Sequence, residues 1–85
     1  MVDKKNNLEK LRKEIDLIDK KIIDSLDKRF NLVKVVGKVK KEQGLFIEDK
    51  NREKIVLSKN NNSKYSKEIK SIYIKIIDES KKIQK

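Results

Sequence analysis

The strongest constraint on the fold is a long stripe of apolar residues in the first half of the chain. Proline is absent, and the first glycine is Gly37. The apolar residues recur at spacings of three and four, as on one face of a helix: Leu8, Leu11, Ile15, Ile18, Ile22, then Leu32, Val36 and Val39. This pattern predicts one continuous helix from about Leu8 to about Glu42, with Gly37 tolerated inside it.

Two shorter helices are expected after this long one. Gly44 in EQGLFIED is a stop signal, and Glu48 or Asp49 supplies an acidic start for a short second helix. That helix ends in the asparagine-rich turn SKNNNSK. A third helix of medium length is expected from about Tyr65 to Gln84, with these residues on its buried side: Ile69, Ile72, Tyr73, Ile76 and Ile77. No segment alternates with period two, so the predicted class is all-α.

The length of the first helix predicts a dimer. A helix of roughly 35 residues spans about 50 Å at 1.5 Å per residue. A compact domain of this size has a radius of gyration of only about 12 Å, so the helix must project beyond its own domain with its apolar stripe exposed. Only 35% of the 85 residues are hydrophobic, which makes a single small core marginal. We expect the same helix of a second copy to cover the stripe in an intertwined homodimer.

Composition excludes several kinds of site. The chain has no cysteine and no histidine. It therefore has no disulfide framework, no thiol chemistry and no imidazole for acid–base work or metal binding, and we expect neither a metal nor a cofactor. No apolar run approaches the roughly 18 residues of a membrane span. The start MVDKKNNLEK is unlike a signal peptide, so the expected compartment is the cytoplasm.

The formal charge of +10 raises the alternative of a basic helical module that binds nucleic acid. However, 21 of the 24 basic residues are lysines, and they are spread along the whole chain. Few aromatic residues are present to stack on bases. Nucleic acid is therefore not the expected partner. The three arginines are more informative, because a guanidinium grips a carboxylate with two parallel hydrogen bonds, which lysine cannot do.

Polar residues interrupt the apolar faces at particular positions. The heptad places Arg29 at position a and Ser25 at position d, inside the stripe. Arg12 and Lys40 fall at the neighbouring e position. A cation on a buried face is costly unless it is paired, so these positions are candidates for a polar site. The third helix turns polar at the end of its buried row, at Ser80 and Gln84. The second helix adds three charged residues: Asp49, Arg52 and Glu53.

Several of these residues have an ordinary structural explanation. Arg29 is suited to a buried ion pair with Asp49 or Glu53. The side chain of Lys40 is long enough to extend past the end of the stripe into solvent. Asp49 is a good N-cap, and Arg12 is suited to an interhelical salt bridge.

Taken together, these residues predict a pocket between helices that carries guanidinium, ammonium, carboxylate and neutral polar groups. No thiol, imidazole or metal-binding cluster accompanies them in the sequence. Such a pocket can bind a small polyanion and place charges around it, but it has little means of acid–base chemistry at neutral pH. The chemistry is thereby restricted to binding, or to a rearrangement that needs no proton transfer.

The chain resembles the all-helical chorismate mutases. An LRxxID opening, an R…VGxxK run and a DxxRE motif occur in the order and spacing of that family, within LRKEIDLIDKKIIDSLDKRF, VGKVK and EDKNREK. The likeness covers nearly the whole chain and implies a single chorismate mutase domain over residues 1–85. It implies conversion of chorismate to prephenate by a unimolecular pericyclic shift, in phenylalanine and tyrosine biosynthesis, without a cofactor. The turn SKNNNSK is shorter than in the family.

The resemblance also implies roles for the residues that bind the two substrate carboxylates. Arg29 would hold one of them. Arg12 would reach into the site of the other protomer and grip the second. Arg52 and Ser80 would help to fix the carboxylate end of the substrate.

The remaining roles implied by the resemblance concern the reacting part of the substrate. Lys40 and Gln84 would donate to the ether oxygen, where negative charge builds as the C–O bond breaks. Glu53 would bind the ring hydroxyl through a hydrogen bond, with Asp49 near it. Lys40, Gln84, Arg29 and Glu53 would thus be the catalytic set. An isochorismate pyruvate lyase on the same scaffold is an alternative, and Glu53 favours the mutase.

Overall fold

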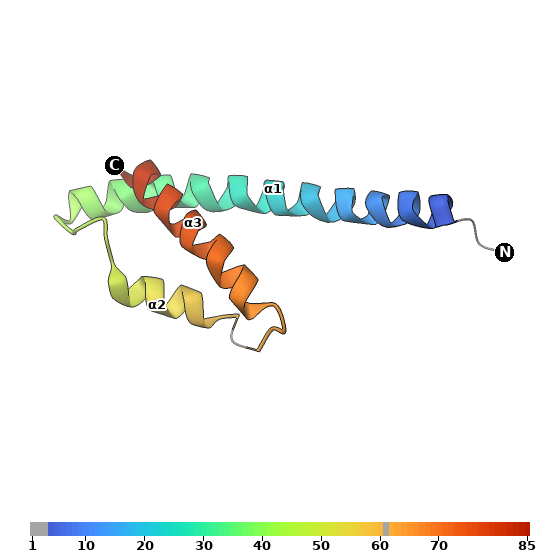
Figure 1. Cartoon of the computed structure of the whole chain (residues 1–85). Coiled ribbons are helices and arrows are strands. Elements are labelled where there is room, and N and C mark those ends of the chain that lie inside the picture. The colour runs from blue at the N-terminus through green and yellow to red at the C-terminus, as the bar shows by residue number, and fades with distance from the viewer. Residues whose placement is uncertain (1–3, 61) are drawn as a thin grey trace.

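The computed structural model describes residues 4–60 and 62–85, with side chains from residue 7 onward, and contains three helices (Figure 1). They are α1 (Lys4–Glu42), α2 (Lys50–Ser58) and α3 (Ser66–Gln84). The predicted all-α class with one long, one short and one medium helix is confirmed. The described helix α1 begins four residues before the predicted start at Leu8, because its first turn is polar and carries no apolar residue that periodicity could reveal.

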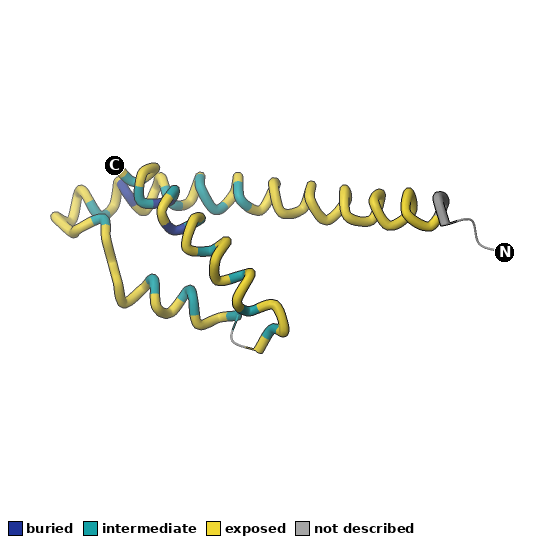
Figure 2. The backbone as a smooth tube through the Cα atoms, in the orientation of Figure 1, coloured by how far each residue is buried: buried dark blue, intermediate teal, exposed yellow. Residues whose placement is uncertain are grey.

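The long helix projects from the rest of the molecule, as its length predicts. The fold measures 65 × 24 × 15 Å, and its radius of gyration of 17.6 Å exceeds that of a compact domain. Figure 1 shows α2 and α3 gathered at the C-terminal part of α1, while the N-terminal half extends alone. Figure 2 shows this half as exposed, and Leu8, Leu11 and Ile15 each leave about half of their surface uncovered.

The buried core of the single chain is small. Among the described residues, Ile77 is the one buried hydrophobic residue, and Ser80 is the one buried polar residue. Helix α3 packs against both α1 and α2, whereas α1 and α2 do not pack on each other. The space between α1 and α2 is therefore open for a cavity.

Gly37 allows α1 and α3 to approach closely. A Cβ atom at this position would lie 2.7 Å from the carbonyl oxygen of Gln84 and 2.8 Å from its Cα atom. Both distances are too short for any side chain larger than hydrogen. The prediction that the long helix continues through Gly37 is confirmed. The sequence did not show that the helix crossing requires a glycine at this position.

Capping contacts set the ends of α1 and α2. Gly44 has a φ of +69°, and the N–H groups of Gly44 and Leu45 donate to the carbonyls of Lys41 and Lys40. This pair of bonds is a Schellman motif, which ends α1. Asp49 caps α2, and its side chain accepts the N–H of Arg52 at 3.0 Å.

One residue of α3 differs from the sequence prediction. Ile72 was placed on the buried side of the third helix, but 61% of its surface is exposed. It lines an apolar groove of about 460 Å³ between α1 and α3, which the single chain leaves open. Within residues 4–60 and 62–85, no helix combines the length and the apolar character that a membrane crossing requires.

Candidate active site

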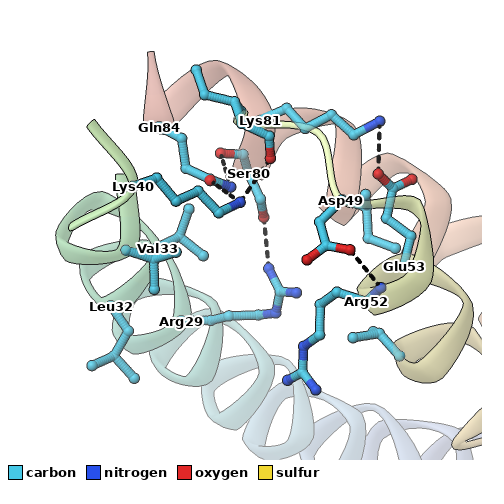
Figure 3. Close-up of a pocket in the computed structure, with 14 residues that line it drawn as sticks. Arg29, Leu32, Val33, Lys40, Asp49, Arg52, Glu53, Ser80, Lys81 and Gln84 are labelled. Carbon is cyan, nitrogen blue, oxygen red and sulfur yellow. Dashed lines mark hydrogen bonds and ion pairs between the residues drawn. The ribbon is translucent and has the colours of Figure 1, made fainter. Parts of the chain in front are cut away.

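A cavity of about 410 Å³ lies between the C-terminal half of α1, the α1–α2 connector, α2 and α3 (Figure 3). Its apolar wall includes Val33 and Val36 of α1, Val56 of α2 and Ile77 of α3. Seven of the eight residues selected from the sequence also line it: Arg29, Lys40, Asp49, Arg52, Glu53, Ser80 and Gln84. Because these residues come from four separate segments of the chain, only the folded structure brings them together.

Arg29 presents its guanidinium to the cavity from α1. Its Nη1 donates to Ser80 Oγ at 2.6 Å, and Ser80 Oγ donates in turn to the carbonyl of Ile76 at 2.7 Å. The Tyr73 ring lies 5.9 Å from the guanidinium carbon, within the range of a cation–π contact. The ion pair of Arg29 with Asp49 or Glu53, considered as an alternative above, does not form. Among the described residues, Arg29 pairs with no carboxylate and so has donors left for an external anion.

Lys40 turns into the cavity instead of extending into solvent. Its ammonium donates to Gln84 Oε1 at 2.8 Å and to the carbonyl of Ile47 at 2.7 Å. An ammonium has three N–H groups, so one remains for a ligand.

The contact with Lys40 also fixes the orientation of the Gln84 amide. Because Lys40 can only donate, the atom that faces it must be the amide oxygen. The amide nitrogen of Gln84 has one long contact, 3.4 Å to the carbonyl of Ser80. Lys40 and Gln84 therefore offer two donors side by side on one wall of the cavity.

The N-terminus of α2 places the acidic residues. Asp49 and Glu53 are one turn apart and line the same cavity. Figure 3 shows the Arg52 guanidinium directed away from the Asp49 carboxylate, although the backbone N–H of Arg52 caps it. Arg52 also borders a neighbouring hollow of about 200 Å³, together with Arg29, Lys59 and Tyr73. The two arginines thus face the same end of the site.

Residues 11–85 match the family model described as chorismate mutase type II. The chain belongs to this family. A solved structure of a conserved hypothetical protein from Pyrococcus furiosus is similar, with 43% sequence identity and a TM-score of 0.83. The match covers 93% of this chain and 96% of that one. No curated protein matches the chain.

Arg12 is the one selected residue that does not line the cavity. It lies on the exposed half of α1, 17 residues before Arg29, or about 25 Å along the helix axis at 1.5 Å per residue. The cavity of the single chain therefore holds two, Arg29 and Arg52, of the three arginines that the resemblance to chorismate mutases implies.

Lys81 lines the cavity and was not selected from the sequence. Its ammonium lies 3.1 Å from Glu53 Oε2 and 3.2 Å from Glu48 Oε1. The pKa of Lys81 is raised, mainly by its interaction with Glu53 and to a smaller extent by its interaction with Glu48. The helical spacing could have indicated Lys81, because position 81 is one turn after Ile77 and so lies on the same buried face.

Proposed function

We propose that this protein is a chorismate mutase, which converts chorismate to prephenate by a pericyclic rearrangement in phenylalanine and tyrosine biosynthesis in the cytoplasm. The observation that carries the proposal is the hydrogen-bonded pair of Lys40 and Gln84, which keeps two donors for one ligand atom. Across the same cavity, Arg29 has donors left for a carboxylate. The family match supports the same reaction class.

The rearrangement needs charge stabilisation more than proton transfer. As the bond from the ether oxygen to the ring breaks and the new C–C bond forms, negative charge grows on that oxygen. Donors from Lys40 and Gln84 would interact more strongly with this oxygen in the transition state than in the substrate, which lowers the barrier. Because no proton is transferred, the reaction does not require histidine or cysteine, and the sequence contains neither.

Positioning is the second contribution. Arg29, supported by Ser80, would hold one carboxylate, with Arg52 at the same end of the site. The carboxylate of Glu53, with Asp49 near it, would accept a hydrogen bond from the ring hydroxyl. Fixing both ends of the flexible substrate selects the compact geometry that the reaction requires, and such positioning can supply several kcal/mol.

The proposal includes a homodimer in which Arg12 acts in trans. The apolar groove between α1 and α3 adjoins the cavity at Arg29, which lines both. The exposed stripe from Leu8 to Ile22 supplies an apolar surface of the matching kind. A second copy of α1 in this groove would carry its Arg12 towards the arginine end of the cavity and complete the site for a dicarboxylate.

The test is the loss of chorismate absorbance with purified protein, with the product identified. We expect prephenate from the wild type and a rate at least about 100-fold lower from Arg29→Ala, equivalent to about 2.7 kcal/mol. Lys28→Ala, which removes an adjacent exposed cation outside the cavity, is the matched control and should keep the wild-type rate.

Two results would overturn the proposal. The first is a folded, dimeric protein that leaves chorismate unchanged. The second is release of pyruvate from isochorismate without mutase activity, which would identify the lyase instead. Binding of nucleic acid with an affinity that falls steeply with salt would favour the basic-module alternative.

A further inference from the structure

Lys81 occupies a place in the cavity for which neither the reaction nor the sequence motifs provide a role. It follows the buried Ser80 on α3, and its side chain reaches across to the carboxylate of Glu53 on α2 (Figure 3). Both side chains are about three-quarters buried, since each has 26% of its surface exposed. The contact therefore differs from an exposed surface ion pair, which contributes little.

The carboxylate of Glu53 depends on this lysine. Glu53 Oε2 is buried, and among the described residues no well-directed hydrogen bond reaches it. The ammonium of Lys81, 3.1 Å away, is the charge that faces this oxygen. A buried carboxylate that lacks a compensating charge is costly and repels other anions. Lys81 therefore offsets a charge that the cavity would otherwise hold unbalanced.

The charge balance of the cavity gives this contact a consequence for binding. Four cations (Arg29, Lys40, Arg52 and Lys81) and two carboxylates (Asp49 and Glu53) line it, for a formal charge of +2. A dicarboxylate substrate carries the opposite charge. Without Lys81 the formal charge of the cavity would fall to +1, and the negative charge of Glu53 would repel the substrate.

We infer that Lys81 is a positioning residue of the active site that acts through Glu53. It offsets the charge of this carboxylate and holds it in the direction in which it accepts the substrate's hydroxyl. The inference rests on the proposed function and adds a residue to it. The second contact of Lys81, with the more exposed Glu48, joins α3 to the α1–α2 connector at the edge of the same cavity.

The test compares Lys81→Met with Lys81→Arg. Methionine keeps most of the apolar stem and removes the charge, so we expect kcat/KM to fall by about tenfold, within the range of coupling between neighbouring residues. Most of this loss should appear in KM, because the hydroxyl is bound alike in the substrate and the transition state. Lys81→Arg should restore most of the activity.

Lys82→Met is the matched control. Lys82 is the next residue on α3, is 65% exposed and pairs with Glu79 at 3.2 Å outside the cavity. Its loss removes the same charge from the same helix, and we expect kcat/KM to stay within about twofold of the wild type. Far-ultraviolet circular dichroism of every variant verifies folding, and Lys81→Gln replaces Lys81→Met if the latter loses its helical signal.

A double-mutant cycle with Glu53→Gln separates positioning from a general effect of charge. If Lys81 acts through Glu53, Lys81→Met should cost less than about twofold in the Glu53→Gln background. Additive losses in active, folded proteins would overturn this inference alone. Wild-type activity in Lys81→Met would do the same. A wild-type protein without turnover of chorismate would overturn the proposed function first, and the inference with it.

Discussion

The ammonium nitrogen of Lys40 lies 2.8 Å from the amide oxygen of Gln84, so a hydrogen bond joins the last turns of α1 and α3. The two residues are 44 positions apart in the sequence. Each uses part of its hydrogen-bonding capacity on the other and keeps a donor for the cavity. Since the carbonyl of Ile47 holds a second proton of Lys40, the pair is oriented before any ligand binds. Preorganised donors of this kind stabilise developing negative charge effectively.

Replacing Lys40 by methionine should remove the stronger of the two donors and leave Gln84 without its orienting partner. We expect kcat for chorismate to fall by about 100- to 1,000-fold, the usual effect of losing an oxyanion donor. Steady-state kinetics measure it. Lys41→Met, at the adjacent exposed position outside the cavity, is the control and should retain the wild-type kcat. A loss of less than tenfold in Lys40→Met would contradict the role given to this ammonium.

Replacing Gly37 by alanine should destabilise the protein. In an ordinary helix interior this change stabilises by up to about 1 kcal/mol. Here the new Cβ would lie 2.7 Å and 2.8 Å from backbone atoms of Gln84, so α1 and α3 would have to separate. We expect the free energy of unfolding in urea to fall by about 1–3 kcal/mol. Because Lys40 lies one turn beyond Gly37, kcat should fall as well.

The sign of the stability change is the test for Gly37. Asn31→Ala, at an exposed position of the same helix, is the control and should leave the free energy of unfolding unchanged or raise it. If Gly37→Ala also stabilised the protein, the close approach of the two helices would be refuted.

Local periodicity explains which parts of the site were predictable. Arg29, Lys40, Ser80 and Gln84 were selected because each interrupts or ends an apolar row on a helix. Asp49, Arg52 and Glu53 were selected as the charged residues of the second helix. The apolar rows show which face of each helix is buried, but they do not show which other helix packs against that face.

The features that depend on pairs of helices were not predictable in this way. The requirement for Gly37 arises from the backbone of α3 at the crossing, 47 residues later in the chain at Gln84. The helical spacing places Lys81 on the buried face of its helix, but its partners, Glu53 of α2 and Glu48 of the connector, appear only in the folded structure. The exposure of Ile72 reflects a groove that one chain leaves open. All three depend on how the helices are arranged in space.

The rate of the proposed reaction should be nearly independent of pH between about pH 6 and 9, since carboxylates, lysines and arginines ordinarily titrate outside this range. The two resolved pKa shifts, those of Lys81 and Glu79, move each pKa further from neutral pH. Glu53 and then Glu48 raise the pKa of Lys81, whereas Lys75 and then Lys82 lower the pKa of Glu79. Lys81 therefore stays protonated to higher pH, which keeps its charge beside Glu53 across the flat range, whereas Glu79 lies outside the cavity and has no part in the reaction. The measurement is kcat at constant ionic strength, and a steep inflection near pH 7 would contradict the site.

Mixing two inactive variants should restore activity if Arg12 acts in trans. In a heterodimer of Arg12→Ala and Arg29→Ala chains, one site would combine the intact Arg29 of the first chain with the intact Arg12 of the second. The other site would lack both arginines. With random exchange, half of the dimers would be heterodimers, so about a quarter of the wild-type activity should return. The control replaces the second chain by the double variant Arg12→Ala/Arg29→Ala, which cannot supply Arg12 and should restore nothing. Subunit exchange is verified by native mass spectrometry, and an inactive mixture with proven heterodimers would show that Arg12 does not complete the site of its partner.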